Sequence, residues 1–147
     1  MTTAESRAEV GKTIKILSNY LNRRLLQIPA FKNQTNITPV QGMILGFVIE
    51  AEDSVFQKDI EQMFTLRRST VSGVLSSMEE SGLITRERVE SDARLRKICA
   101  TEKGKKLHSL IRSELGGIEY QITAGLTDAE VTAFLHTAEK IKRNLLK

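Results

Sequence analysis

The 147-residue sequence contains few of the residue types that form reactive or cross-linked sites. It has one cysteine, Cys99, and two histidines, His108 and His136, so it cannot close an internal disulfide or form a zinc site of cysteines. No H-E-x-x-H, G-x-S-x-G, P-loop or G-x-G-x-x-G pattern occurs. We therefore expect no enzymatic activity, no cofactor and no metal site.

Long apolar runs are absent as well. The longest nearly uncharged apolar stretch, 43–49, is far shorter than the roughly 18 residues that a bilayer-spanning helix needs. Near the N-terminus, Glu5, Arg7 and Glu9 occupy positions where a secretory signal would require apolar residues. We expect a cytoplasmic protein that does not span a membrane.

Charge is distributed unevenly along the chain. The net charge is +4, and the segment 83–106 alone contains eight basic and four acidic residues, which accounts for all of it. Acidic residues gather elsewhere, at Glu50, Glu52, Asp53, Asp59 and Glu61. The basic segment is typical either of a solvated surface or of a face that binds a polyanion.

Helix starts are well marked in this sequence. Capping-box patterns occur at 38–41, 54–57 and 127–130, and the first of them has Pro39 at the first helical position. Apolar residues at spacings of three and four predict one helix from about Ile14 that ends near Pro29. They predict further helices after each capping box, over 66–81 up to Gly82, and from Thr101.

Two segments rich in β-favouring residues, 83–88 and 95–100, flank a polar turn at 89–94 and predict a hairpin. Three short helices followed by a hairpin form a winged helix-turn-helix, in which the 66–81 helix would enter a DNA major groove. The exposed side of that helix carries arginine and small hydroxyl residues, which suits close approach to another surface. The fold class we expect is mainly α with a small β-hairpin wing and a helical dimerisation region.

Four short motifs carry a resemblance to a known family. They are the run R-S-T-V-S at 68–72, E-S-G-L-I at 80–84, D-A-R at 92–94 and T-E-K-G at 101–104. In these motifs the chain resembles the MarR family of bacterial transcription regulators over nearly its whole length. The resemblance implies a homodimer in which two winged domains bind adjacent half-sites of a pseudo-palindromic operator, with release by a small aromatic or anionic effector.

We expect a single MarR-like chain, 1–147, with a winged module at 37–100 and dimerisation helices at 8–30 and 101–147. The apolar stripes of these terminal helices need a surface to bury against, and a second copy supplies one. The alternative is that they pack on their own winged domain. The predicted dimerisation residues are Leu17, Leu21, Leu115, Ile118, Phe134, Leu135, Ile141 and Leu145.

The predicted contacts of the 66–81 helix are arginines that can bind guanine or phosphate and hydroxyl groups that can bind bases or backbone oxygens. They are Arg67, Arg68, Ser69, Thr70, Ser72 and Ser76. Arg68 points partly away from Ser72, so it either contacts phosphate or pairs with Glu61.

In the wing, Arg94 corresponds to the minor-groove arginine of the family. Asp92 either braces Arg88 or Arg94 through a charge-assisted pair or is a simple turn residue. Arg86, Arg88, Arg96 and Lys97 are either phosphate contacts or solubility charges. Ser91, at the turn, completes the predicted wing contacts.

Effector contacts are not identified by the sequence. Tyr20, Arg23, Arg24 and His108 are candidates for a pocket, and equally for an interface or the surface. Cys99 lies in the second predicted strand, away from the region where the family's peroxide sensors carry their thiol, which favours a small core residue over a redox sensor. The alternative function is a winged-helix adaptor that binds proteins without reading DNA.

Overall fold

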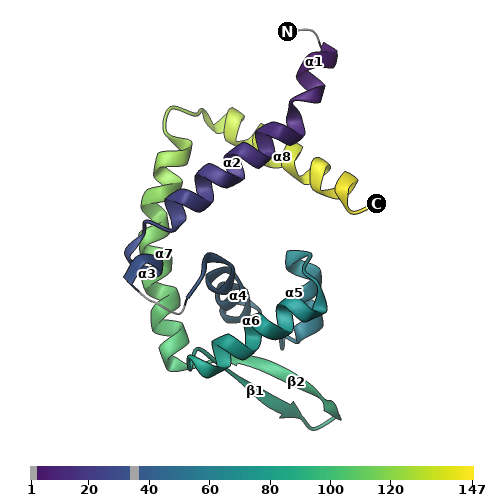
Figure 1. Cartoon of the computed structure of the whole chain (residues 1–147), viewed down its shortest axis with the longest axis vertical. Coiled ribbons are helices and arrows are strands. Elements are labelled where there is room, and N and C mark those ends of the chain that lie inside the picture. The colour runs from purple at the N-terminus through teal and green to yellow at the C-terminus, as the bar shows by residue number, and fades with distance from the viewer. Residues whose placement is uncertain (1–2, 34–36) are drawn as a thin grey trace. The chain divides into compact units, whose positions relative to one another are not determined.

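The computed structural model describes residues 3–33 and 37–147, with eight helices and one two-stranded antiparallel sheet in these ranges (Figure 1). The chain divides into two compact units, Met1–Glu114 and Leu115–Lys147. This boundary lies inside a helix and coincides with neither limit of the predicted winged module. The division into a winged module and dimerisation helices therefore stays a prediction.

The elements of the first unit follow the predicted order of helices and hairpin. They are α1 (Thr3–Ala8), α2 (Val10–Leu25), α3 (Pro29–Asn33), α4 (Pro39–Glu50), α5 (Gln57–Phe64), α6 (Arg68–Glu80), β1 (Ile84–Val89) and β2 (Asp92–Ala100). Helix α7 (Glu102–Thr123) runs from the first unit into the second, and α8 (Asp128–Leu145) belongs to the second.

The core of the first unit lies among α4, α5, α6 and the hairpin. Ile44, Ile60, Leu75 and Met78 are fully buried there, whereas Met43 and Met63, which share the predicted apolar sides of α4 and α5, are each 58% exposed. Figure 1 shows α6 running beside the β1–β2 hairpin. These elements form a winged helix-turn-helix, as predicted from the sequence.

Two of the three predicted capping boxes are confirmed. Thr38 Oγ1 accepts a hydrogen bond from Gln41 N at 3.3 Å, and Gln41 Oε1 accepts one from Thr38 N at 3.0 Å. Thr127 and Glu130 make the same reciprocal pair at 3.2 and 2.8 Å. Both helices therefore start where side chains satisfy backbone donors that lack an intrahelical partner.

The third box, 54–57, is wrong. Val55 pairs instead with Ile98 of β2, whose N–H donates to Val55 O at 2.8 Å, so this segment is extended. Helix α5 begins two residues later than the box at Ser54 implies, with Asp59 Oδ2 accepting from Phe56 N at 2.8 Å. A carboxylate within the first turn thus replaces the predicted serine cap.

The first long helix also ends earlier than predicted. Helix α2 stops at Leu25, and the N–H groups of Gln27 and Ile28 then bond to carbonyls only three residues back. Pro29 begins the separate helix α3 rather than terminating α2, because proline fits the first helical position. Glu114 Oε2 accepts from Ala30 N at 2.9 Å and satisfies a donor at this start.

The hairpin turn is shorter than the predicted segment 89–94. Strand β2 already includes Asp92, Ala93 and Arg94, so only Glu90 and Ser91 lie between the strands. The register pairs Ile84 with Ala100 through Arg88 with Arg96, and it shifts between Arg88 and Val89. Because of this shift, β2 contains more residues than β1. The additional residues are those that sequence alternation had placed in the turn.

A dense set of hydrogen bonds joins the end of α6 to the start of α7. Gly82 has φ +75°, and the N–H of Leu83 donates to Met78 O at 3.0 Å, which closes α6 as predicted. Thr101 Oγ1 donates to Gly82 O at 2.6 Å and accepts from Gly104 N at 3.1 Å. A Cβ atom at Gly104 would overlap Leu83 O, so only glycine allows this close approach.

Two long helices expose their apolar residues. Neither α2 nor α8 contains a buried residue. Even the large apolar side chains of Leu17, Tyr20, Phe134 and Leu135 are each more than half exposed. Within the described residues, we find no helix whose length and hydrophobicity would let it cross a bilayer.

Candidate nucleic-acid interface

The exposed side of α6 is smooth and polar. Successive residues of a helix are turned by about 100°, so the buried side formed by Val71, Leu75 and Met78 leaves a group of small residues on the opposite side. That group is Ser69, Gly73 and Ser76, with Thr70 beside it, and all four are exposed. None of these four side chains is larger than threonine, so another surface can approach the helix backbone closely at these positions.

Two of the predicted serine contacts already have partners within the protein. Ser72 Oγ accepts from Gln57 Nε2 at 2.8 Å, which joins α5 to α6. Ser76 Oγ accepts from Arg86 Nη2 at 3.3 Å, which joins α6 to the hairpin. Ser72 is half-buried and Ser76 is exposed, so Ser69 and Thr70 are the better placed of the predicted hydroxyl groups.

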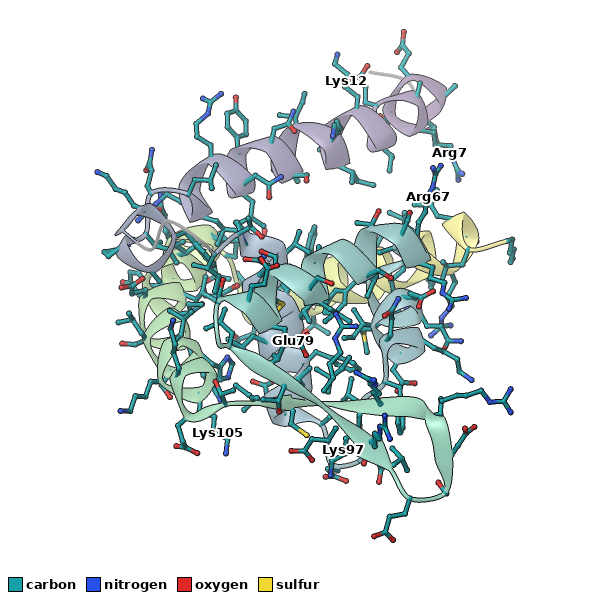
Figure 2. The ribbon with its side chains drawn as sticks, turned by 60° about the horizontal axis from the view of Figure 1, so that its bottom comes forward. Arg7, Lys12, Arg67, Glu79, Lys97 and Lys105 are labelled. Atoms are coloured by element: carbon teal, nitrogen blue, oxygen red, sulfur yellow. The ribbon has the colours of Figure 1, made fainter. Side chains whose placement is uncertain are left out.

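The N-terminal end of α6 is basic. Arg67 is the cap residue, Arg68 opens the helix, and the first turn has no acidic residue. Because a helix N-terminus is already partly positive, two arginines at this end favour a bound anion. In the part of the chain that the structure describes, Arg68 forms no ion pair, so its predicted pairing with Glu61 is not formed. Figure 2 shows Arg67 at this end of the helix, far from Glu79.

Two arginines lie on the face of the hairpin that contacts α6. Arg88 and Arg96 are direct cross-strand partners, on the same strand faces as Arg86, which contacts α6. Both are exposed, and neither has an ion-pair partner among the described residues. Like charges directly opposite each other on a sheet are destabilising. This arrangement is favourable when a polyanion lies between or beside the two guanidinium groups.

At the hairpin tip, Asp92 contacts Arg94 in a way that fits both sequence interpretations, a turn residue and a carboxylate near the arginine. Asp92 Oδ1 accepts from Arg94 N at 2.9 Å and lies 3.7 Å from Arg94 Nε. The side chain of Arg94 is nonetheless 95% exposed, so it extends away from the protein. Ser91, at the turn, is exposed beside it. Asp92 thus holds the backbone N–H of Arg94 and lies near Nε, while the rest of the guanidinium group stays exposed.

The opposite face of the hairpin has a different character. Lys97 Nζ lies 3.9 Å from Glu87 Oε2, and Cys99 lies on the same face. Cys99 lines an open cavity of about 330 Å³ beside the 52–55 loop and β2. Burial and the Glu87 carboxylate raise the pKa of the Cys99 thiol, so it is a weak nucleophile at neutral pH. This agrees with a packing role for Cys99.

The candidate pocket residues differ in their exposure. Tyr20 is 62% exposed on α2, with no buried residue around it on that helix. His108 is half-buried on α7, and its Nε2 lies 3.6 Å from Glu50 Oε1, so it is not a simple surface residue. The structure identifies no effector contacts.

The predicted dimerisation residues differ in exposure. Leu17, Leu21, Phe134, Leu135 and Leu145 are exposed, and Leu115 and Ile141 are intermediate. Ile118 is only 2% exposed in the single chain. Its predicted contact with a second copy stays a prediction.

Sequence reasoning missed three residues of this interface. Gly73 lies at the centre of the exposed side of α6, and nothing lies within 4 Å of a Cβ built there. Glu80 is also on that side and would repel phosphate, which confines a DNA contact to the N-terminal half of α6. Gln57 holds Ser72. The spacing of Gly73 from Val71 and Leu75 could have identified it, whereas the Gln57 contact has no local sequence signal.

Comparison with known proteins agrees with this geometry. Residues 35–95 match the family model described as MarR family. The transcriptional regulator FarR of Neisseria gonorrhoeae is 30% identical over 91 residues, which are 62% of this chain and 62% of that protein. The chain spans about three fifths of the length of the curated relatives that it matches.

Two solved structures share the fold over almost the whole chain. The transcription regulator MarR from Oenococcus oeni PSU-1 is 27% identical with a TM-score of 0.73, and the match covers 91% of this chain and 98% of that one. MepR of S. aureus, solved in a complex with DNA, is 24% identical with a TM-score of 0.82, and the match covers 92% and 96%. These relatives are transcriptional regulators rather than enzymes.

Proposed function

Because this chain belongs to the MarR family, we propose that it is a sequence-specific DNA-binding regulator that acts as a cytoplasmic homodimer on a pseudo-palindromic operator. In this proposal the N-terminal half of α6 enters the major groove, and Ser69, Thr70 and Arg67 contact bases or phosphates. Arg94 extends from the wing into the adjacent minor groove.

The observation that carries the proposal is the cross-strand pair of Arg88 and Arg96. Two opposed guanidinium groups with no carboxylate partner in the described part of the chain make a poor hairpin for a protein that binds no anion. They lie on the hairpin face that α6 contacts through Arg86, so a phosphate backbone beside α6 would neutralise both. MepR, which shares this fold, was solved in a complex with DNA.

The homodimer is supported by the exposed apolar residues of α2 and α8. A monomer would leave Leu17, Phe134 and Leu135 in water, and a second copy offers identical stripes to bury them. Two copies then present two α6 helices to half-sites about one helical turn, or roughly 34 Å, apart. A small aromatic or anionic effector that changes this spacing would release the operator, which makes repression the mode of action we propose.

Selection of duplexes from a random pool, followed by affinity measurements at several salt concentrations, tests this function. Six or more phosphate contacts predict a fall in affinity of about a thousandfold or more between 50 and 200 mM salt. The selected sites should have twofold symmetry, and a panel of phenolic ligands added to the binding reaction should weaken binding. A chain with no measurable affinity for any duplex at 50 mM salt is an adaptor instead, and the proposal fails.

A further inference from the structure

Arg86 differs from the other wing arginines because its side chain points back onto α6. Its Nη2 donates to Ser76 Oγ at 3.3 Å, and its Nε lies 3.8 Å from Glu79 Oε2. The Arg86 side chain is 22% exposed, whereas that of Arg94 is 95% exposed. A single side chain of β1 thus bridges to two residues of the C-terminal half of α6.

The contact with Glu79 is incomplete. Arg86 Nε is buried and has no hydrogen-bond partner among the described residues. A distance of 3.8 Å exceeds the usual range of a hydrogen bond by less than about 1 Å, so a small movement of the hairpin toward α6 would close it. A charge-assisted bond to a buried donor is strongly favoured, so this pair draws the two elements together.

We propose that Arg86 is a positioning residue that sets the distance between the wing and α6, and that it does not itself contact phosphate. The inference rests on the proposed function, since the wing position matters only if the wing binds DNA. Arg86 also neutralises Glu79, a half-exposed carboxylate beside the surface that would face phosphates. The reach of Arg94 into the minor groove therefore depends on Arg86.

The first test measures affinity for the selected operator duplex and its salt dependence, using the full chain. Arg86→Gln should weaken binding about tenfold or more while the slope of log affinity against log salt stays unchanged. The matched control is Arg88→Gln, an exposed arginine two residues along the same strand face, which should reduce that slope by about 1.8, because each copy of the dimer loses one phosphate contact. A slope reduced equally by Arg86→Gln would overturn the proposal, because Arg86 would then be a phosphate contact.

The second test asks whether Arg86 acts through Arg94. If Arg94→Ala costs about thirtyfold in affinity in the wild-type background, it should cost less than about threefold in the Arg86→Gln background. Arg88→Gln and Arg94→Ala should instead multiply. The reversed pair Arg86→Glu with Glu79→Arg keeps the net charge and should restore most of the Arg94 contribution. Multiplying effects of Arg86→Gln and Arg94→Ala, with no recovery in the reversed pair, would contradict positioning.

A third measurement needs no DNA, and so separates this inference from the proposed function. Hydrogen exchange of the β1 and β2 amides should be faster in Arg86→Gln than in Arg88→Gln, while the amides of α4 and α5 keep their protection. Faster exchange of the hairpin in a chain that binds no duplex would support the contact and reject the regulator. Unchanged exchange in a chain that binds DNA normally would reject the positioning role alone.

Discussion

The winged module and the helices α2 and α8 differ in how far their apolar side chains are buried. In the module, Ile44, Ile60 and Leu75 are fully buried. Helix α2, with 16 residues, and helix α8, with 18, contain no buried residue and leave Leu17 and Leu135 more than half exposed. An apolar stripe thus identifies the side of a helix that will be covered, but it does not identify what covers it. One region buries its apolar residues within the chain, and the other leaves them exposed in the single chain.

The largest expected effect comes from charges on the exposed stripe of α2. Leu17→Asp combined with Leu21→Asp should raise the dimer dissociation constant by about five orders of magnitude or more, because each interface anchor lost costs about 2 kcal/mol and the two copies lose four anchors. Sedimentation across a concentration series measures it. Asn19→Asp, on the other side of the same helix, is the control. A dimer that survives the double change would mean that α2 is not at the interface.

A second pair of variants tests the comparison directly. Leu75→Ala removes a fully buried side chain and should cost about 2–5 kcal/mol of unfolding free energy at any protein concentration. Leu135→Ala removes a side chain that is 61% exposed in the single chain, so its cost should appear only at concentrations where the dimer forms. Denaturant titrations at two protein concentrations distinguish them. Equal, concentration-independent losses would show that α8 is buried within its own chain.

Loss of a helix cap should have a smaller effect. Thr38→Ala removes the acceptor of Gln41 N at the start of α4 and should destabilise the chain by about 1 kcal/mol. Thr38→Ser keeps an acceptor at the same position and serves as the control. Denaturant midpoints of the two variants should differ, and identical midpoints would mean that Gln41 alone maintains this helix start.

The smallest effect should have the opposite sign. Gly73→Ala fills open space on a solvent-facing helical position, so it should stabilise the chain by roughly 0.5–1 kcal/mol. The added methyl group lies at the centre of the side of α6 proposed to meet DNA, so operator affinity should fall while stability rises. Chemical denaturation and duplex titration of the same preparation measure both. A gain in both quantities would place the DNA elsewhere on the protein.

The fold could be predicted where the signal is local. The boxes at Thr38 and Thr127 satisfy donors within one helical turn, so residue types three apart are sufficient. The box at Ser54 was wrong because Val55 takes part in a bridge with Ile98, more than forty residues away in the sequence. A long-range backbone pair competes with local capping, and no pattern near Ser54 reports it.

The candidate site could be predicted at the level of surfaces but not of individual side chains. Residue types placed arginine and hydroxyl groups on α6 and the wing, yet Ser69 and Ser72 have the same chemistry in the sequence. Only the structure shows that Ser72 Oγ already accepts a hydrogen bond from Gln57 and that the Arg86 side chain lies toward Glu79. The direction of a long side chain depends on neighbours from other elements, which a single sequence does not specify.

The junction at Thr101 and Gly104 joins the end of α6 firmly to the start of α7. Besides the Thr101 bonds, Lys103 Nζ donates to Ser81 O at 2.7 Å, so three consecutive carbonyls at the end of α6 are each held by the segment that starts α7. Because Gly104 has no side chain, the backbone of the first turn of α7 lies directly against Leu83 O. We therefore expect a tilt of this turn to move the C-terminal end of α6 as well. A tilt of that turn would therefore change the orientation of the helix proposed to read the operator.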